Sequence, residues 1–482
     1  MSSARRVIPL IPIAAASEPG VEPALKIQPR AVTGLYSRWR WLLVWLTQAV
    51  FVGLPWLNWG GHQAVLFDLE ARRFYLFGAV LLPQDLVYLT GLLVFCALLL
   101  FFATAVAGRV WCGFACPQTV YTEMFMWIEH RAEGDRLARL RWDAAPWSLP
   151  ALRRRSAKHL GWLLLSLLTG FSLVAWFTPV RPLAGALLDW ALGPWEAFWM
   201  LFYGAITYLH AGVLREKICQ HACPYGRFQG SMLDARTLVV SYDVSRGEPR
   251  GARARGVAPA SKGQGDCVDC TLCVQVCPVG IDIRQGLQSA CISCGVCIDA
   301  CDRVMDKLAA PRGLIRFAAM QDAGLGPGGL KAALWRPRAM LYGGGLLILA
   351  MAMTLAWSQR PELRLNAMRD RSVLVRPVED GAVENVYRLQ VMNASLQARE
   401  IRLSVVGQVA QAVEPELEIS HSGPLRMDPA GAMTVVVTVR MSARQQALHA
   451  GGGPLPIRFV VQDVAGGDGA ARAETLSTFL AG

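Results

Sequence analysis

Five long apolar segments limit what this chain can fold into more than any other feature of its sequence. Each is close in length to the ~20-residue helix that crosses the hydrocarbon core of a bilayer, and they carry almost no charge. Backbone polar groups find no water inside a bilayer, so such segments are expected to be helical. Trp and Tyr gather at their ends, as at a membrane interface. The predicted spans are Trp41–Leu57, Leu86–Ala107, Leu160–Phe177, Trp195–Leu214 and Ala339–Trp357.

Lysine and arginine are distributed unevenly around these segments. They are frequent before the first segment and between the second and third, but scarce in the loops 58–85 and 178–194. Loops rich in these residues stay in the cytoplasm. We therefore expect the N-terminus and the segments 108–159 and 215–338 on the cytoplasmic side, and everything after Ser358 outside, in the periplasm.

Residues 1–40 are expected to form a cytosolic N-terminal tail. The start "RRVIPLIPIAAA" has some features of a signal peptide, but Pro9 and Pro12 interrupt its short apolar run, so we interpret it as uncleaved. The predicted location is the bacterial inner membrane, crossed several times and surrounded by membrane lipid.

The segment 361–482 follows a different pattern. Its short runs alternate apolar and polar residues with period two and are separated by Gly, Pro and Asn, which is typical of an antiparallel sandwich. Its length suits one immunoglobulin-like domain. We expect it to serve structure or docking rather than catalysis. The alternating apolar positions are Tyr387, Leu389, Val391, Ile401, Leu403, Val405, Met433, Val435, Val437, Val439, Leu455, Ile457, Phe459 and Val461.

Eight of the thirteen cysteines lie in two runs within residues 267–310. Each run reads C-x2-C-x2-C-x3-C, the spacing of bacterial two-cluster ferredoxins, in which the fourth cysteine of each run binds the other cluster. Zinc ribbons pair C-x2-C units instead, and disulfides are disfavoured in the cytosol. The spacing predicts that one [4Fe–4S] cluster binds Cys267, Cys270, Cys273 and Cys301, and the second binds Cys277, Cys291, Cys294 and Cys297.

The segment before these runs, residues 241–266, is rich in Gly, Arg, Ala and Pro. This composition predicts a flexible linker. Its arginines are expected to face anionic lipid headgroups rather than nucleic acid, because the linker lies next to the membrane.

A second pair of cysteine motifs follows two of the apolar segments. Each reads C-x3-C-P: Cys112 and Cys116 precede Pro117, and Cys219 and Cys223 precede Pro224. Residues four apart share a helix face, provided that the helix continues that far, and proline marks where a helix ends or restarts. Soft thiolates favour Cu(I), and the imidazole of His221 would suit copper as well. Ordinary buried thiols and a third iron–sulfur cluster are the alternatives.

These features predict a multi-domain membrane protein. It comprises an α-helical transmembrane bundle of about five spans, an inserted bacterial-type ferredoxin domain with two [4Fe–4S] clusters, and a C-terminal all-β immunoglobulin-like sandwich. The expected boundaries are 1–40 for the tail, 41–240 for the membrane domain with four spans, 241–266 for the linker, 267–310 for the ferredoxin domain, 339–357 for the fifth span and 361–482 for the sandwich.

From about Trp39 to its end, including a C-terminal immunoglobulin-like domain after the last span, the chain closely resembles the cytochrome c oxidase accessory protein family, CcoG/FixG. The resemblance is carried by residues 108–136, 222–251 and 265–307, and by "GGHQAVLFDLEARRFYLFG" after the first span. It implies a cupric reductase that supplies Cu(I) for assembly of the cbb3-type cytochrome oxidase. The expected partners are copper ions, the machinery of cbb3-type oxidase assembly and an unidentified cytosolic electron donor.

Other functions are compatible with the same motifs. A quinol-linked membrane ferredoxin that passes electrons to a respiratory reductase is one alternative, and a scaffold with structural clusters is another. No C-x2-C-H motif occurs, which excludes a covalently attached c-type haem.

Overall fold

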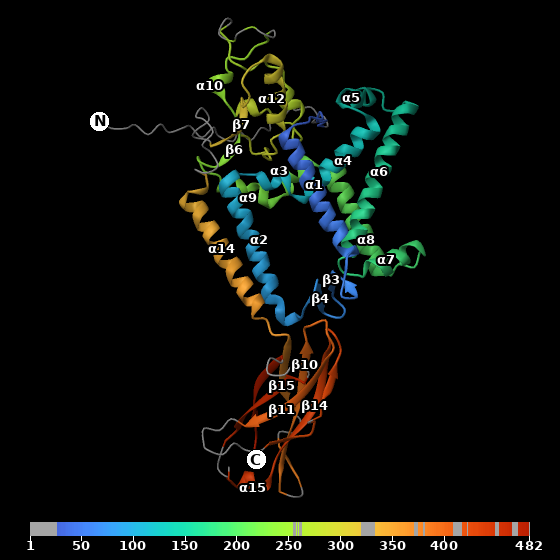
Figure 1. Cartoon of the computed structure of the whole chain (residues 1–482). Helices are drawn as coiled ribbons and strands as arrows, with labels where there is room; N and C mark the ends of the chain where they lie inside the picture. The colour runs from blue at the N-terminus through green and yellow to red at the C-terminus, as the bar shows by residue number, and fades with distance from the viewer. Residues whose placement is uncertain are drawn as a thin grey trace, which may run out of the picture.

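A computed structural model describes residues 27–482, apart from 254–256, 258, 260–262, 320–332, 371–374, 379–380, 408–416, 422, 449–452, 465–470 and 482. The prediction for residues 1–26 of the N-terminal tail lies outside the described residues. The ferredoxin domain lies at one end of a layer of long helices, and the all-β domain lies at the other end (Figure 1). This arrangement agrees with the multi-domain fold predicted from the sequence.

Among the described residues, four helices are long and apolar enough to cross a membrane. They are α2 (Leu86–Ala107, after the turn Pro83–Asp85), α6 (Leu149–Val174), α8 (Pro194–Thr207, continued by the π-helical turn η3, Tyr208–Leu214) and α14 (Pro337–Ser358). They correspond to the second to fifth predicted spans.

The first predicted span differs from the other four. Trp41–Leu57 lies mostly within helix α1 (Leu35–Gly53), but α1 is not among the four sufficiently apolar helices. Its first turns carry Arg38 and Arg40, which lower its mean hydropathy. Figure 1 nevertheless shows α1 running through the same layer as the others.

Short elements join the long helices at both ends. Near the ferredoxin domain these are α3 (Val110–Phe114), α4 (Pro117–Glu133), α5 (Arg136–Ala144), the π-helical turn η4 (Ile218–Ala222) and α9 (Pro224–Met232). At the other end they are η1 (Leu54–Trp56), β1 (Asn58–Trp59), β2 (His62–Gln63), β3 (Val65–Asp68), β4 (Arg73–Leu76), β5 (Ala79–Leu81) and α7 (Val180–Leu188). The sequence analysis did not predict the β3–β4–β5 sheet.

A buried ionic network ties α4 to its neighbours. The carboxylate of Glu129, fully buried, pairs with Arg139 at 3.2 Å and with Arg215 at 3.0 Å. Unpaired charges at this depth would be costly, whereas a three-membered network compensates them. The network therefore fixes the chain entering the second C-x3-C-P motif against the helix that follows the first.

The ferredoxin domain extends beyond the cysteine runs. Its elements are β6 (Leu238–Tyr242), α10 (Val244–Gly247), α11 (Leu272–Gln275), η6 (Ile283–Gln285), α12 (Val296–Leu308) and β7 (Ile315–Ala319). Strands β6 and β7 pair antiparallel, with Leu238 opposite Ala319 and Tyr242 opposite Ile315. This pairing closes the domain at residues 238–319, wider than the predicted 267–310.

The described part of the predicted linker is not loose. Arg246 pairs with Asp266 at 2.5 Å, and the backbone N–H groups of Gly251 and Gly265 donate to carbonyl groups of Cys267 and Pro249. The prediction of a flexible segment from Gly, Arg and Pro content was wrong for these residues, because their arginines bond to the ferredoxin domain itself.

The C-terminal domain is a sandwich of two antiparallel sheets. One has the order β12-β14-β10-β8, with β9 also paired to β10, and the other β13-β11-β15-β16. The strands are β8 (Leu363–Arg369), β9 (Arg376–Pro377), β10 (Val383–Asn393), β11 (Arg399–Gly407), β12 (Leu417–Ile419), β13 (Leu425–Met427), β14 (Ala432–Met441), β15 (Leu455–Asp463) and β16 (Arg472–Phe479), with α15 (Ala443–Leu448) between β14 and β15.

The predicted alternation describes the core of this sandwich. Tyr387, Leu389 and Val391 of β10 are fully buried, and so are Ile457, Phe459 and Val461 of β15. The rings of Tyr387 and Phe459 meet edge to face, with centroids 4.9 Å apart. Of the fourteen predicted positions, only Val405 and Met433 are half-buried.

Asp85 fixes the sandwich to the membrane helices. This carboxylate lies just before α2, is 2% exposed, and pairs with Arg360 at 3.1 Å and with Arg364. The two arginines belong to the segment that leaves α14 and enters β8. The hydroxyl of Tyr88 also donates to the carbonyl oxygen of Ala356 at 2.9 Å.

Replacing Asp85 with Ala is therefore expected to loosen the junction. Removing one partner of a buried ion pair leaves the other charge uncompensated and costs about 3–5 kcal/mol. Glu474 is a matched control, because it also pairs with two arginines, Arg458 and Arg472, but is about one-third exposed. Exposed pairs contribute at most about 1 kcal/mol.

Hydrogen exchange of residues 359–369 in lipid nanodiscs measures the difference. Faster exchange in the Asp85→Ala variant, but not in Glu474→Ala, is expected. Equal exchange in the two variants would show that the junction is held by other contacts.

Candidate functional site

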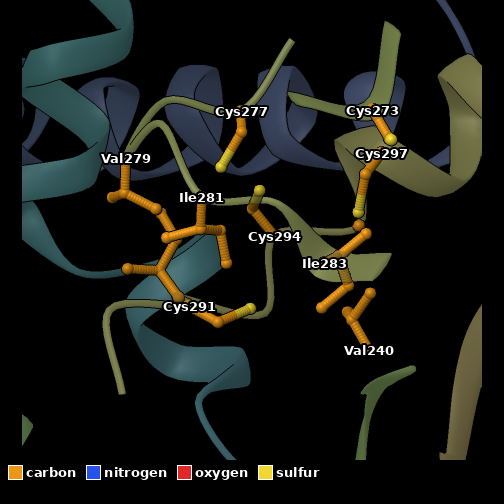
Figure 2. A pocket seen from close by; sticks show the side chains of 11 residues that line it. Val240, Cys273, Cys277, Val279, Ile281, Ile283, Cys291, Cys294 and Cys297 are labelled. Atoms are coloured by element: carbon orange, nitrogen blue, oxygen red, sulfur yellow. The ribbon is translucent and has the colours of Figure 1, made fainter. Parts of the chain in front are cut away.

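One cavity in the ferredoxin domain is lined by four cysteines of the second predicted set. Cys277, Cys291, Cys294 and Cys297 surround it, and Cys273 touches its side. Figure 2 shows the sulfur atoms of Cys277 and Cys294 pointing toward each other, with Cys273 beside Cys297. Val240, Val279, Ile281, Ile283 and Ile292 complete an apolar wall.

A second cavity is lined by all four cysteines of the first predicted set. Cys267, Cys270, Cys273 and Cys301 surround it, and Tyr242 and Ile315 from the β6–β7 pair cover it. The two cavities have similar volumes, about 350 and 370 Å³. Cys273 lines both, so the two spaces are adjacent.

The arrangement suits clusters better than single ions. In a [4Fe–4S] cluster each cysteine binds a different iron, so the thiolates surround a space rather than converge on a point. Within the described ranges, no three Cys, His, Asp or Glu side chains form a group that could hold one metal ion, and this holds for the cysteines of the C-x3-C-P motifs as well as for those of the ferredoxin domain. Burial raises the pKa of Cys291 and of Cys301 to about 12, so metal binding must displace their protons.

The turns that present these thiols repeat between the two runs. Asp269 and Thr271 have φ values of 52° and 57°, and Ser293 and Gly295, at the same positions of the second run, have 53° and 73°. Left-handed backbone is unfavourable for residues other than glycine. The chain adopts it twice at equivalent positions because each turn must bring three cysteines to one side.

The two C-x3-C-P motifs are also structural repeats. Gly108 and Arg215, each four residues before the first cysteine, end their helices with φ values of 56° and 41°. The second cysteine of each motif then closes a turn, with Cys116 N–H donating to Trp111 and Cys223 N–H donating to Ile218.

The expectation that the two cysteines of a motif share a helix face is wrong, and the expectation that each proline marks where a helix restarts is confirmed. The cysteines of each motif do not share one continuous α-helix face, since α3 ends at Phe114 and Cys219 lies in the π-helical turn η4. Pro117 and Pro224 do begin new helices, with Cys116 and Cys223 at their N-caps.

The four thiols of Cys112, Cys116, Cys219 and Cys223, here called the membrane-face thiols, lie near one another. Burial, together with the neighbouring thiols of the group, raises the pKa of Cys112 to about 12 and that of Cys219 to about 11. The thiols of Cys112 and Cys219 are therefore protonated near neutral pH until a metal replaces the protons. His221 is exposed within the η4 turn.

Two side chains position this group. The Cys112 thiol donates to Oε1 of the fully buried Gln229 at 3.4 Å, and the Gln229 amide donates to the carbonyl oxygen of Gly108 at 3.1 Å. Arg109 donates to the carbonyl oxygens of Ser289 and Gly226, so it joins the ferredoxin domain to both C-x3-C-P motifs.

The first motif touches the ferredoxin domain directly. A Cβ atom added to Gly113 would lie 2.7 Å from the carbonyl oxygen of Ile292 and 2.8 Å from the Cα of Cys294. Cys112 packs against the apolar cluster that includes Cys277 and Cys294. The membrane-face thiols therefore lie beside the Cys277–Cys297 cavity.

Sequence reasoning missed this contact surface. Besides Gly113 and Arg109, it includes Asp299 of α12, whose carboxylate accepts from the N–H groups of Tyr36 and Ser37 and so caps the start of α1. The glycine between the cysteines of "CGFAC" was the available signal, because glycine marks close backbone approach.

Comparisons with known proteins agree with this architecture. The chain matches a family model described as "4Fe-4S dicluster domain" over residues 214–320 and one described as "4Fe-4S binding domain" over residues 89–134. A model described as "IG-like fold at C-terminal of FixG" matches residues 353–482.

Curated relatives cover most of the chain. "Nitrogen fixation protein FixG" of Rhizobium meliloti is 38% identical over 81% of each chain, and "Protein RdxA" of Cereibacter sphaeroides is 37% identical over 96% of this chain and 99% of its own. A FixG-related crystal structure from Vibrio parahaemolyticus shares 20% identity over 25% of this chain and 97% of its own, with a TM-score of 0.21, too low for any structural conclusion. From the full-length relatives, the chain belongs to the FixG family.

Proposed function

We propose that this membrane iron–sulfur electron-transfer protein reduces Cu(II) to Cu(I) for assembly of the cbb3-type cytochrome c oxidase. The observation that carries the proposal is the contact between Gly113, inside the first C-x3-C-P motif, and the Ile292–Cys294 backbone of the ferredoxin domain. It brings four soft ligands next to a predicted electron carrier.

The two ferredoxin cavities would hold one [4Fe–4S] cluster each. Cys267, Cys270, Cys273 and Cys301 would bind the first, and Cys277, Cys291, Cys294 and Cys297 the second. Bound clusters would supply one-electron carriers, and reduction of one Cu(II) requires one electron.

The membrane-face thiols would bind the copper substrate. Thiolates stabilise Cu(I) relative to Cu(II), so the site itself favours the reduced product. Gln229 and Arg109 hold the two motifs in place, and the exposed His221 would be a further ligand. The reaction moves an electron and needs no general acid or base.

The proposed orientation follows the charge distribution. The ferredoxin domain would face the cytoplasm and the sandwich the periplasm, in a bacterial inner membrane. The sandwich would then serve docking to the assembly machinery, without a part in electron transfer.

The test is a variant with Ser at Cys112, Cys116, Cys219 and Cys223. Even changes outside the ligand shell cost about 10–100-fold in metal affinity, so copper binding and reduction should fall by at least that factor. Dithionite-reduced protein is mixed anaerobically with Cu(II), and a Cu(I)-specific chelator reports the product. Cys96→Ser, which changes an exposed cysteine of α2, is the control. Unchanged copper reduction in the four-Ser variant would place the copper site elsewhere.

A third cluster on the membrane-face thiols is the second candidate. The match of a "4Fe-4S binding domain" model to residues 89–134, which contain Cys112 and Cys116, favours it. Iron analysis separates the two: about eight iron atoms per chain fit two clusters and about twelve fit three.

A further inference from the structure

An open cavity of about 700 Å³ lies where α1, α4, α5 and the ferredoxin domain meet. The part of this space that water-sized groups can enter is about 140 Å³, close to that of a cavity that holds one benzene ring. From the membrane part it is lined by Trp41, Met126, Trp127, His130 and Arg139, among others, and from the ferredoxin domain by Val276, Pro278 and Val296. We call it the interfacial cavity.

The cavity combines aromatic walls with a polar end. The rings of Trp41 and Trp127 meet edge to face at 6.5 Å. Arg40 is paired with Glu123 at 2.6 Å, and Arg139 is paired with Glu129. Both buried arginines are matched by carboxylates, and the third arginine of the lining, Arg30, is exposed to solvent. The buried wall of the cavity therefore suits a neutral, flat molecule better than an anion.

One polar atom of the lining lacks a partner. The Arg139 side chain is 4% exposed, and its two terminal nitrogens bond to Glu129 and to the carbonyl oxygen of Pro29. Its Nε has no hydrogen-bond partner among the described residues. A buried donor without an acceptor is costly, and a ligand oxygen would satisfy it.

The cavity is lined by residues that adjoin an exposed apolar surface of α1 on one side and the cluster-binding cysteines on the other. Leu42, Trp45 and Leu46, next to Trp41 on α1, are more than half exposed, as expected for a lipid-facing surface. On the other side, Val276 and Pro278 flank Cys277, and Val296 precedes Cys297. A ligand here would lie between the bilayer and the Cys277–Cys297 cavity.

We propose that the interfacial cavity binds the headgroup of a membrane quinol, which is the electron donor of the protein. The quinol loses two electrons and two protons and becomes the quinone. Iron–sulfur clusters held by the eight ferredoxin cysteines would take up the two electrons, one each. The exposed imidazole of His130 would take up each proton and release it to water. The quinol thus takes the place of the cytosolic donor expected from the sequence. This inference rests on the proposed electron-transfer function but not on copper as the final acceptor.

The first test is binding without turnover. Copper-free protein in nanodiscs is titrated with decylubiquinone and with menadione, and bound quinone is measured by equilibrium partition. Trp127→Ala removes an exposed ring from the wall, and Met126→Phe fills the cavity. Aromatic contacts of this kind change affinity by roughly fivefold, so at least that loss is expected in each variant. Trp147→Ala, which removes a ring that is 91% exposed, is the matched control.

The second test follows electrons. Anaerobic decylubiquinol or menadiol should generate the EPR signals of reduced clusters in the parent and in the four-Ser variant, but more slowly in Trp127→Ala and Met126→Phe. Absence of copper reduction in the parent protein, with normal quinone binding, would therefore count against the copper function alone. Any of three results would overturn the quinol site: no binding of quinone, equal affinity for quinone in all variants, or a bound phospholipid that quinone does not displace.

Discussion

Replacing Cys301 with Ser is expected to lower the iron content from about eight to about four atoms per chain. Cys301 is the fourth cysteine of the second run, on α12, yet it lines the cavity of Cys267, Cys270 and Cys273. Its loss should therefore damage the cluster of the first run and leave that of the second run intact. EPR of the reduced protein, together with iron analysis, measures both effects.

Comparing the EPR signals of single Cys→Ser variants makes this prediction specific. The signal lost in Cys301→Ser should be the one lost in Cys267→Ser, and a different one should disappear in Cys291→Ser. Cys96→Ser changes a cysteine within α2 and should leave both signals unchanged. If Cys301→Ser resembled Cys291→Ser instead, each run would bind its own cluster and the crossed assignment would be wrong.

The ferredoxin architecture was accessible from the sequence because its chemistry dictates its spacing. Thiolates that bind one cluster must follow one another at short, fixed intervals. Each cavity is lined by the four cysteines that the spacing assigns to one cluster. The strands of the sandwich were accessible for a similar reason. Tyr387, Leu389 and Val391 alternate with polar residues because one face of β10 is buried.

Contacts between distant segments left no such periodic signal. Asp299 caps α1, and Arg109 joins Ser289 to Gly226. Each of these hydrogen bonds links residues that lie 117 to 262 positions apart in the sequence. The β6–β7 pair, which extends the ferredoxin domain, also depends on strands separated by more than seventy residues. A local pattern does not specify which of many short apolar runs will pair.

The arginine-rich linker illustrates a second limit. Its composition is typical of a flexible segment, but composition does not reveal partners. Arg246 finds Asp266, and Arg253 donates to the carbonyl oxygen of Gly265 at 2.7 Å. Arginine thus has different roles in different places: in α1 it lowers the mean hydropathy of the helix, and in the linker it holds the described residues on the ferredoxin domain.

Replacing Gly113 with Val is expected to separate the ferredoxin domain from the membrane-face thiols. The new Cβ would meet the carbonyl oxygen of Ile292 and the Cα and N atoms of Cys294, all within 2.9 Å. These are backbone atoms, which do not move aside as a flexible side chain does. Overpacking of this kind costs about 1–3 kcal/mol, which corresponds to a factor of roughly five or more in the docked population.

Three measurements separate loss of docking from loss of folding. Iron content and the EPR signals of both clusters should stay as in the parent, because Gly113 lies outside both ferredoxin cavities. Hydrogen exchange of residues 289–295 should become faster, and electron transfer from the reduced clusters to metal at the membrane-face thiols should slow by roughly fivefold or more. Gly230→Val is the matched control, because a Cβ at Gly230 in the nearby helix α9 would meet nothing within 4 Å. If the Gly113→Val and Gly230→Val variants had equal rates of hydrogen exchange and of electron transfer, the close approach at Gly113 would have no part in the electron path. The route to the membrane-face thiols would then cross the interface elsewhere. The contact between Arg109 and Ser289 would be the next one to change.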